Sequence, residues 1–214
     1  MLQKRERGGS SLRMESPMQE RKIPSRTECL RLMKQHGMLE NIMSHSLEVT
    51  RVALFLSREL NQRGQRVDPA LVEAAALLHD LAKTECLLTK KDHARSGYEL
   101  LSRIGYKVIG EVVAQHIWMW KRGEPERVSE EELVNYADKR VRHDQIVSLR
   151  ERFIDLKERY GKGPGALQYL EALETATFEI ERKIFFILGM DPDDLVRTVE
   201  EEKTEQQNTE QQNT

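Results

Sequence analysis

The apolar residues of this chain recur at helical spacing between residues 23 and 200, and no segment shows the alternation of a half-buried strand. The clearest stripe consists of Ala166, Leu170, Leu173, Ile180, Ile184 and Ile187. A chain patterned in this way buries its apolar side chains by packing helix against helix. The sequence therefore predicts an all-α fold, a helical bundle.

Helix-start signals recur along the chain. The sequences SRTE at 25–28 and SEEE at 129–132 are capping boxes, in which a serine and a glutamate satisfy free backbone N–H groups. Asp68 is followed by Pro69, which favours the first helical position, and Asp92 is placed to cap another helix. These signals predict that separate helices begin at these points.

The length of 214 residues suits a single domain of ordinary size. With 38% hydrophobic and 33% charged residues the composition is that of a highly charged globular protein, and a formal net charge of −2 gives no pull toward nucleic acid or membrane. No stretch approaches the roughly 20 apolar residues of a membrane span, and the N-terminus lacks the apolar segment of a secretory signal. We expect a cytoplasmic protein.

The two ends of the chain differ from its middle. Residues 1–22 are polar and bear glycine and serine, and residues 201–214 end in two copies of EQQNT. Segments of this composition cannot form a core, so both are expected to be disordered. The two cysteines, Cys29 and Cys86, show no paired spacing and are expected to be reduced thiols.

The stretch AAALLHDLAK at 74–83 carries a histidine and a carboxylate, His79 and Asp80, into an apolar helix. A buried ionised carboxylate is costly unless it is paired or bound to a cation, and a metal ion would satisfy both groups at once. A second pair, His143-Asp144, lies among arginines and is expected on a solvated helix face. The first pair is therefore the candidate metal site.

Further histidines and an aspartate lie one per helix on the neighbouring helices, each at the edge of an apolar stretch. They are His45, His93, His116 and Asp138. Each histidine alone is typical of a hydrogen-bonded structural residue, but the ordered set favours metal ligation.

This order of residues resembles the HD-domain superfamily of metal-dependent phosphohydrolases, in particular its HDIG-type, dinuclear-site subset. AAALLHDLAK, HARSGYELL and YADKRV carry the resemblance, which extends from about residue 25 to residue 160. It implies an HD-type helical domain over residues 23–200, with a core at about 40–145 and additional C-terminal helices at about 146–200.

The resemblance also implies the ligand set. The first metal position would correspond to His45, His79, Asp80 and Asp138, and Asp80 would bridge to a second ion completed by His93 and His116. Imidazole with carboxylate suits Fe, Mn or Zn, so the cofactor is expected to be a divalent transition metal, with two ions bound.

Sequence signatures that the chain lacks indicate which branch of the superfamily it resembles. No Gly-Tyr-Pro signature follows His116, which argues against the cyclic-dinucleotide phosphodiesterases. The chain is more similar to the bacterial branch that includes symmetric diadenosine tetraphosphate hydrolases. Because VVAQH at 112–116 replaces the AIRYH expected there, the similarity is to a type of site and not to that substrate.

We expect a metal-activated hydroxide to attack a small phosphate ester, such as a nucleotide, in line. Asp80 and Lys83 are the candidate catalytic residues. Lys83 is expected on the same helix face as His79 and Asp80, from which its ammonium could reach a metal-bound phosphate. Arg95 and Arg140 are candidate phosphate ligands, and Trp118 or Trp120 could stack on a base. The alternative for the cations is the protein surface, and for the tryptophans it is packing in the bundle.

Two other functions use the same sequence features. An HD-type di-iron oxygenase presents the same four histidines and two aspartates, and a non-catalytic sensor would bind a nucleotide or metal without turnover. Other motifs fail, since GKGPG at 161–165 lacks the spacing and the preceding strand of a phosphate-binding loop. Basic residues do not cluster into a nucleic-acid-binding stripe.

Overall fold

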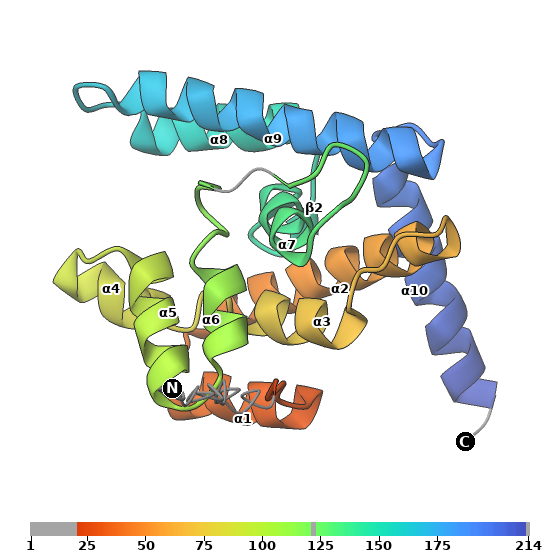
Figure 1. The fold of residues 1–214 in the computed structure, drawn as a ribbon, viewed down its shortest axis with the longest axis horizontal. Helices are drawn as coiled ribbons and strands as arrows, with labels where there is room; N and C mark the ends of the chain where they lie inside the picture. The colour runs from red at the N-terminus through yellow and green to blue at the C-terminus, as the bar shows by residue number, and fades with distance from the viewer. Residues whose placement is uncertain (1–20, 121–122, 213–214) are drawn as a thin grey trace, which may run out of the picture.

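Helices α2 (Glu40–Gln62), α3 (Pro69–Leu78) and α7 (Glu130–Lys139) pack against one another at the centre of the computed structural model, which describes residues 21–120 and 123–212 (Figure 1). Apart from two short strands, β1 (Val141–Arg142) and β2 (Gln145–Ile146), the described elements are helices. The prediction of an all-α fold is therefore confirmed.

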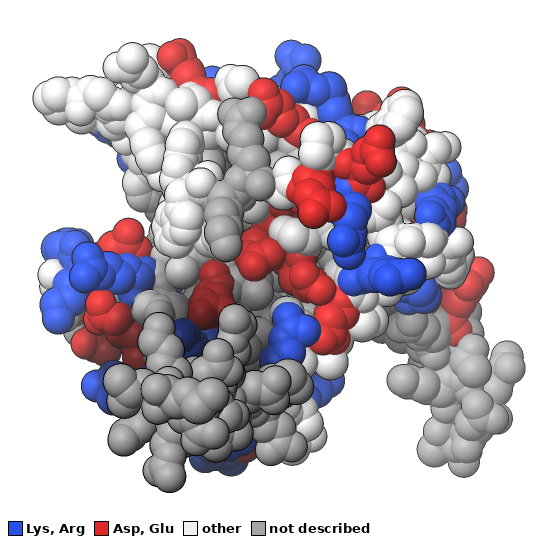
Figure 2. Space-filling view, viewed as in Figure 1, with Lys and Arg blue, Asp and Glu red and all other residues white. Residues whose placement is uncertain are grey.

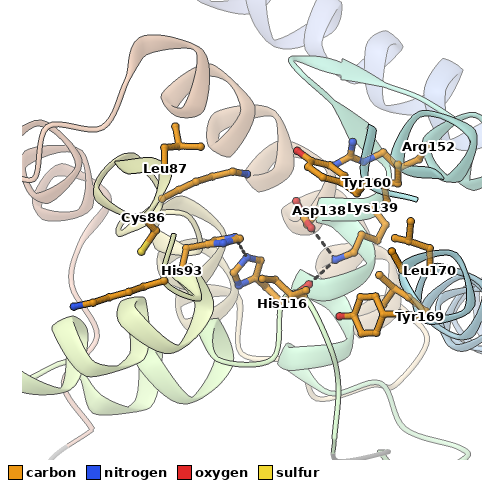
Figure 3. A pocket seen from close by; sticks show the side chains of 16 residues that line it. Cys86, Leu87, His93, His116, Asp138, Lys139, Arg152, Tyr160, Tyr169 and Leu170 are labelled. Atoms are coloured by element: carbon orange, nitrogen blue, oxygen red, sulfur yellow. Dashed lines mark hydrogen bonds and ion pairs between the residues drawn. The ribbon is translucent and has the colours of Figure 1, made fainter. Parts of the chain in front are cut away.

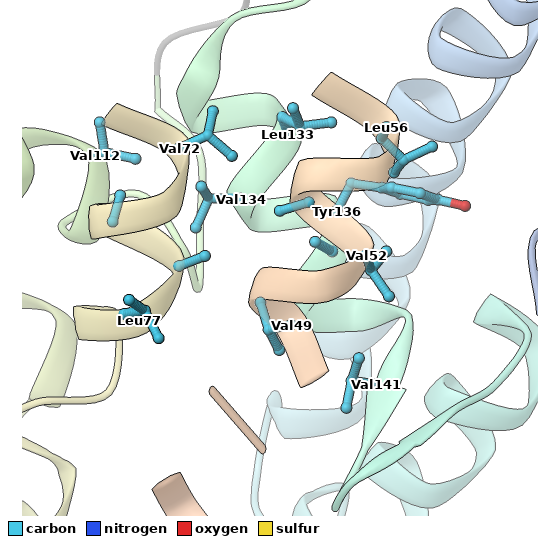
Figure 4. Close-up of a cluster of buried hydrophobic side chains, with 14 of the residues drawn as sticks. Val49, Val52, Leu56, Val72, Leu77, Val112, Leu133, Val134, Tyr136 and Val141 are labelled. Atoms are coloured by element: carbon cyan, nitrogen blue, oxygen red, sulfur yellow. The ribbon is translucent and has the colours of Figure 1, made fainter. Parts of the chain in front are cut away.

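The core lies where these three helices meet (Figure 4). Val52 and Leu56 of α2, Leu77 of α3 and Leu133 of α7 are all withdrawn from solvent. Burying an aliphatic side chain of this size stabilises the fold by about 1.5–3 kcal/mol. The apolar periodicity of the sequence thus produces the central three-helix unit that supports the site.

The remaining helices surround this centre. They are α1 (Arg26–Gln35), α4 (Lys83–Thr89), α5 (His93–Arg103), α6 (Lys107–Val113), α8 (Leu149–Tyr160), α9 (Ala166–Leu188) and α10 (Asp194–Gln212). In Figure 1, α8 and α9 form a layer above α7, α4 to α6 lie on one side, and α1 lies below α3. Tyr136 of α7 meets Phe185 of α9 edge to face, with ring centroids 6.0 Å apart, which ties the upper layer to the centre.

The predicted helix starts are confirmed. Ser129 and Glu132 form a reciprocal capping box, and the side chains of Asp68 and Asp92 each accept two backbone N–H groups. The Ser25 hydroxyl accepts from the Glu28 backbone N–H at 3.3 Å, although the Glu28 side chain turns to Arg31 instead of closing the box. Local capping chemistry therefore decides where these helices begin.

Two local expectations are wrong. The helix that carries AAALLHDLAK ends at Leu78, and turns separate it from α4, which begins at Lys83. His143-Asp144 is exposed as expected, but it forms the tip of the β1–β2 hairpin instead of a helix face. His143 has a φ of 58°, which a helix cannot accommodate and a two-residue hairpin turn requires.

Helix α10 continues to Gln212, through most of the tail that was expected to be disordered. Glutamate, glutamine and lysine have high helix propensity, so polar composition argues against a core but not against a surface helix. Arg51 and Arg58 of α2 form ion pairs with Glu200 and Glu202 and hold the start of this segment on the bundle. The expected disordered arm at 1–22 lies outside the described residues, except for its last two.

Acidic and basic side chains are interspersed over the face shown in Figure 2, in keeping with the small net charge. Within the described residues, no helix combines the length and apolar character needed to cross a membrane.

Candidate metal centre and adjoining cavity

Six side chains from five segments converge at one point between α2, α3 and α7. His45 lies in α2, His79 and Asp80 follow α3, His93 begins α5, His116 follows α6, and Asp138 lies near the end of α7. The structure thus brings together every residue that the sequence singled out as a metal ligand. All of them are buried except His93, which is partly exposed.

Asp80 is the residue that the two halves of this cluster share. On one side, His79 Nε2 lies 3.4 Å from Asp80 Oδ2 and 3.6 Å from Asp138 Oδ1, and His45 Nε2 lies 3.0 Å from Asp138 Oδ1. On the other side, His93 Nε2 and His116 Nε2 lie 3.2 and 3.6 Å from Asp80 Oδ1. The ligand atoms form two groups, each with its atoms within 4.8 Å of one another. One group is His45, His79 and Asp80, and the other is Asp80, His93 and His116.

Backbone carbonyls orient three of the histidines. The Nδ1–H groups of His45, His79 and His116 donate to the carbonyls of His143, Ala76 and Val113 at 2.8, 2.8 and 2.7 Å. This fixes the tautomer, so that in each neutral ring the lone pair of Nε2 faces the cluster. Metal-binding histidines are commonly oriented in this way.

Two buried polar atoms of the cluster have no hydrogen-bond partner among the described residues, His79 Nε2 and Asp80 Oδ1. One further contact raises the same question, because the lone pair of His116 Nε2 faces His93 Nε2 at 3.2 Å, and this contact needs a proton on His93 Nε2 or a cation between the two atoms. Unpartnered buried polar groups are rare and destabilising. A divalent cation beside Asp80 would satisfy all of them, so the residues present fit a metal.

The electrostatics of the cluster favour ligation as well. Burial opposes the charge on Asp80, but the charge of His79, when that ring is protonated, and the charge of Lys83 outweigh burial and hold the pKa of Asp80 well below the usual value. The Asp138 carboxyl, buried beside Lys139, also has a pKa well below the usual value. Burial lowers the pKa of His116 to about 4, so this imidazole is neutral at pH 7, as a ligand must be.

A cavity of about 390 Å³ opens onto this cluster, and His93, His116 and Asp138 form part of its lining (Figure 3). Four cationic side chains also line it, namely Lys83, Lys91, Lys139 and Arg152. Lys83 Nζ lies 2.6 Å from Asp80 Oδ2, and buried Lys139 donates to Asp138 Oδ2 at 2.8 Å and to the His116 carbonyl at 2.5 Å. The cavity therefore joins a candidate metal centre to a cluster of positive charge.

Of the predicted substrate-binding residues, Lys83 lines this cavity and the other four do not. Arg140 is fully buried elsewhere, where its guanidinium donates to the Val147 carbonyl, the Tyr136 hydroxyl and Glu181. A guanidinium held in this way cannot turn to a phosphate, so the expectation for Arg140 is wrong.

Arg95 is exposed on α5 and pairs with Glu99, away from the cavity lining. Trp118 is half-buried and its ring lies 5.5 Å from that of Tyr169, so it supports a cavity residue without lining the cavity itself. Trp120 is exposed. The Trp118 indole therefore packs against the bundle, which was the alternative stated for the tryptophans.

Sequence reasoning missed Lys139, Arg152 and Tyr169. Lys139 could have been found from its position directly after Asp138. Arg152 and Tyr169 carry no local signal, because only the packing of α8 and α9 over α7 brings them to the cavity.

A largely buried set of four histidines and two aspartates, joined through one shared carboxylate, defines an all-α protein with a candidate dinuclear metal centre. Residues 42–142 match the family model of the HD domain, and this range contains all six side chains. This segment of the chain, slightly less than half of its length, is therefore similar to the HD domain. Helices α8 to α10 lie outside the matched range.

One curated relative is a tRNA (cytidine(56)-2'-O)-methyltransferase from Picrophilus torridus. The two chains are 26% identical over 190 residues, which cover 82% of this chain and 50% of the relative. The chain thus spans about half the length of the curated relative that it matches. No solved structure matches significantly.

Proposed function

We propose that this protein is a metal-dependent phosphohydrolase that cleaves a small phosphate ester, such as a nucleotide. The observation that carries the proposal is the cavity, which joins the His and Asp cluster to Lys83, Lys139 and Arg152. An oxygenase substrate such as a polyol has no need of so many cations, whereas a phosphate dianion does. The same cations favour phosphate-ester hydrolysis over a di-iron oxygenase that acts on a polyol.

The six candidate ligand residues would hold two divalent ions of Fe, Mn or Zn, and Asp80 belongs to both candidate ligand groups. Bound there, such ions lower the pKa of a coordinated water and neutralise charge on the attacking and leaving oxygens. Overall, one water adds its hydroxyl to phosphorus, the P–O ester bond breaks, and the leaving oxygen takes the remaining proton. Lys83, fixed by its contact with Asp80, would bind the phosphate oxygens and hold the ester in place.

Methyl transfer to tRNA is the activity that the relative's name states, and we do not propose it for this chain. The alignment leaves half of that protein unmatched, so the activity in its name belongs to a longer chain. The family match instead falls on the range that contains the candidate metal ligands.

Elemental analysis of the purified protein, followed by a phosphate-release screen with Fe, Mn and Zn, tests the proposal. We expect close to two metal ions per chain and hydrolysis of at least one class of phosphate ester. Asp80→Ala should lose both ions and reduce turnover by about 10³-fold or more, since it removes the shared ligand. The matched control is Asp144→Ala, which removes the exposed carboxylate of the second His-Asp pair and should leave metal content and turnover unchanged.

Two outcomes would contradict the proposal. If Asp80→Ala kept its full metal content, the ligand assignment would be wrong. If the metal-loaded protein released phosphate from no ester but consumed dioxygen with a polyol or phosphonate, the oxygenase would be the better reading. Circular dichroism of both variants shows whether each is folded.

A further inference from the structure

The side of the cavity opposite the metal ligands is built by α8 and α9, which lie outside the range matched by the HD-domain model. We call this side the α8–α9 wall, and its members are Arg152, Leu156, Tyr160, Ala166, Tyr169, Leu170 and Leu173. Figure 3 shows Arg152, Tyr160, Tyr169 and Leu170 facing His93 and Cys86 across the cavity. The wall therefore meets whatever group a bound phosphate carries.

Arg152 is the charged member of the α8–α9 wall. Its side chain is 15% exposed, one terminal nitrogen pairs with Asp155 at 3.1 Å, and its buried Nε has no hydrogen-bond partner among the described residues. Lys83 and Lys139 line the same cavity, so the three cations face one space. A guanidinium that lines a cavity together with two ammonium groups suits a phosphate.

The rest of the α8–α9 wall is apolar. Leu156, Leu170 and Leu173 contribute only hydrocarbon, and the side-chain polar atoms besides those of Arg152 are the hydroxyls of Tyr160 and Tyr169. No carboxylate or amide side chain of the wall could bind the hydroxyls of a sugar or polyol. A polar ester group would therefore lose hydrogen bonds to water on entering, whereas an apolar group would gain by burial.

Tyr169 gives the α8–α9 wall an aromatic surface of fixed position. Its ring packs against that of Trp118 at 5.5 Å with an interplanar angle of 34°, so the indole supports it from behind. Aromatic rings stack well on a platform held in this way. The 390 Å³ cavity is of a size that holds a phosphate and one ring system.

We propose that the substrate is a phosphate ester whose ester group carries an aromatic ring. Arg152 binds the phosphate together with Lys83 and Lys139, and the aromatic group lies against Tyr169, Leu170 and Leu173. This rests on the proposed function for the reaction, but the α8–α9 wall is assigned by its own side chains. If the substrate is a nucleotide, this assignment means that the wall stacks on the face of the base and makes no base-specific hydrogen bonds to its edge.

Binding of phenylphosphonate and methylphosphonate, two phosphonates that differ in the apolar group, tests the proposal without turnover. Isothermal titration calorimetry of the full-length, metal-loaded protein should show phenylphosphonate binding at least about 10-fold more tightly, from the apolar area of the ring. Tyr169→Ala should bring this ratio below about 3-fold while methylphosphonate binding stays the same. The side chain of Tyr169 is 45% exposed, so its removal should leave the fold intact.

Arg152→Ala should weaken both phosphonates equally, by about 30-fold or more, because both carry the same anionic group. Arg152→Lys should recover part of this loss. The matched controls are Arg95→Ala, at an exposed position of α5, and Phe186→Ala, at an 89%-exposed position of α9; neither residue lines the cavity. Both controls should leave the two affinities unchanged.

Equal affinity for the two phosphonates, binding of neither, or an unchanged affinity in Arg152→Ala would overturn the proposal. Phosphate release from phenyl phosphate and glycerol phosphate, measured in parallel, separates it from the proposed function. If the protein prefers phenylphosphonate but hydrolyses no ester, the assignment of the α8–α9 wall is supported and the proposed hydrolase function is contradicted. If the protein hydrolyses both esters without any preference, the proposed hydrolase function is supported and the assignment of the α8–α9 wall is contradicted.

Discussion

A single hydrogen bond at each of three histidines decides which ring nitrogen is available in the candidate metal centre. Because backbone carbonyls accept the Nδ1 protons of His45, His79 and His116, the Nε2 atoms face Asp80 and Asp138. The carbonyls belong to three different segments of the chain. The position of the backbone therefore sets the chemistry of the side chains.

Cys29 allows a prediction about alkaline pH at the residue scale. Its side chain is inaccessible to solvent, and burial, with the charges of Glu73 and Glu28, raises the pKa of its thiol from 9.0 to about 12. Above pH 9 the unfolded chain loses this proton while the folded chain keeps it, so the free energy of unfolding falls as pH rises. The slope from this residue is at most about 1.4 kcal/mol per pH unit up to pH 12.

Urea unfolding of wild type and Cys29→Ala at pH 8, 9, 10 and 11 measures this effect. We expect the difference in stability between the two proteins to shift in favour of the variant as pH rises above 9. A difference that stays constant over this range would show that the Cys29 thiol titrates normally in the folded protein.

At the scale of elements, the β1–β2 hairpin supports the metal centre through its backbone. The His143 carbonyl accepts from His45 Nδ1, and the φ of His143 is 58°. His143→Val places a β-branched residue at a φ it disfavours, so the carbonyl should shift and metal affinity should fall about tenfold. His143→Gly accepts the same φ and should bind metal as wild type does.

Metal content after dialysis against graded chelator concentrations distinguishes these two variants. Equal retention by His143→Val and His143→Gly would mean that the hairpin carbonyl does not orient His45. Equal losses in both would instead point to the imidazole of His143, whose Nε2 lies 3.1 Å from Arg159.

Arg140 joins α7 to the hairpin and to α9. It donates to the Val147 carbonyl at 2.7 Å and to Glu181 at 3.3 Å, and both side chains are buried. Arg140→Met leaves Glu181 without its cation and should lower the free energy of unfolding by about 3–5 kcal/mol. Urea denaturation measures the loss, and Arg95→Met, at an exposed site, should change stability by less than about 0.5 kcal/mol.

The double variant Arg140→Met/Glu181→Leu tests whether the loss of stability comes from the pairing of Arg140 with Glu181. Removing both charges together should lower stability by less than Arg140→Met alone, since no buried charge is left unpaired. A double variant as unstable as the sum of the single ones would contradict a direct pairing.

For the whole molecule, a metal bound among five segments should stabilise the entire fold. The candidate ligands come from α2, the α3–α4 connection, α5, the segment after α6, and α7. Metal at about 100 times its Kd adds about 2.7 kcal/mol, which raises Tm by roughly 5–10 °C for a chain of this size. Differential scanning calorimetry with and without added Mn or Zn measures the shift.

Asp80→Ala should show no such rise in Tm, while Asp144→Ala should behave as wild type does. A rise of the same size in Asp80→Ala would mean that the added metal binds elsewhere on the protein.

The fold class and the candidate ligands were predictable from the sequence because their causes are local. Helical periodicity and the caps at Asp68, Asp92 and Ser129 depend on neighbouring residues, and they are read directly from the chain. The order of the histidines and aspartates pointed to the HD domain in the same direct way, and the family model matches that segment at residues 42–142. None of these features requires knowledge of how the helices pack.

The roles of the remaining residues were decided by the tertiary structure. Arg140 and Arg152 are both arginines beside helix ends or starts, yet packing buries one against Glu181 and places the other in the cavity. The contact of the His143 carbonyl with His45 joins residues 98 positions apart. The sequence by itself determined an all-α chain with an ordered ligand set, whereas the shape and charge of the cavity arise from the packing of α8 and α9 over α7, which no local pattern records.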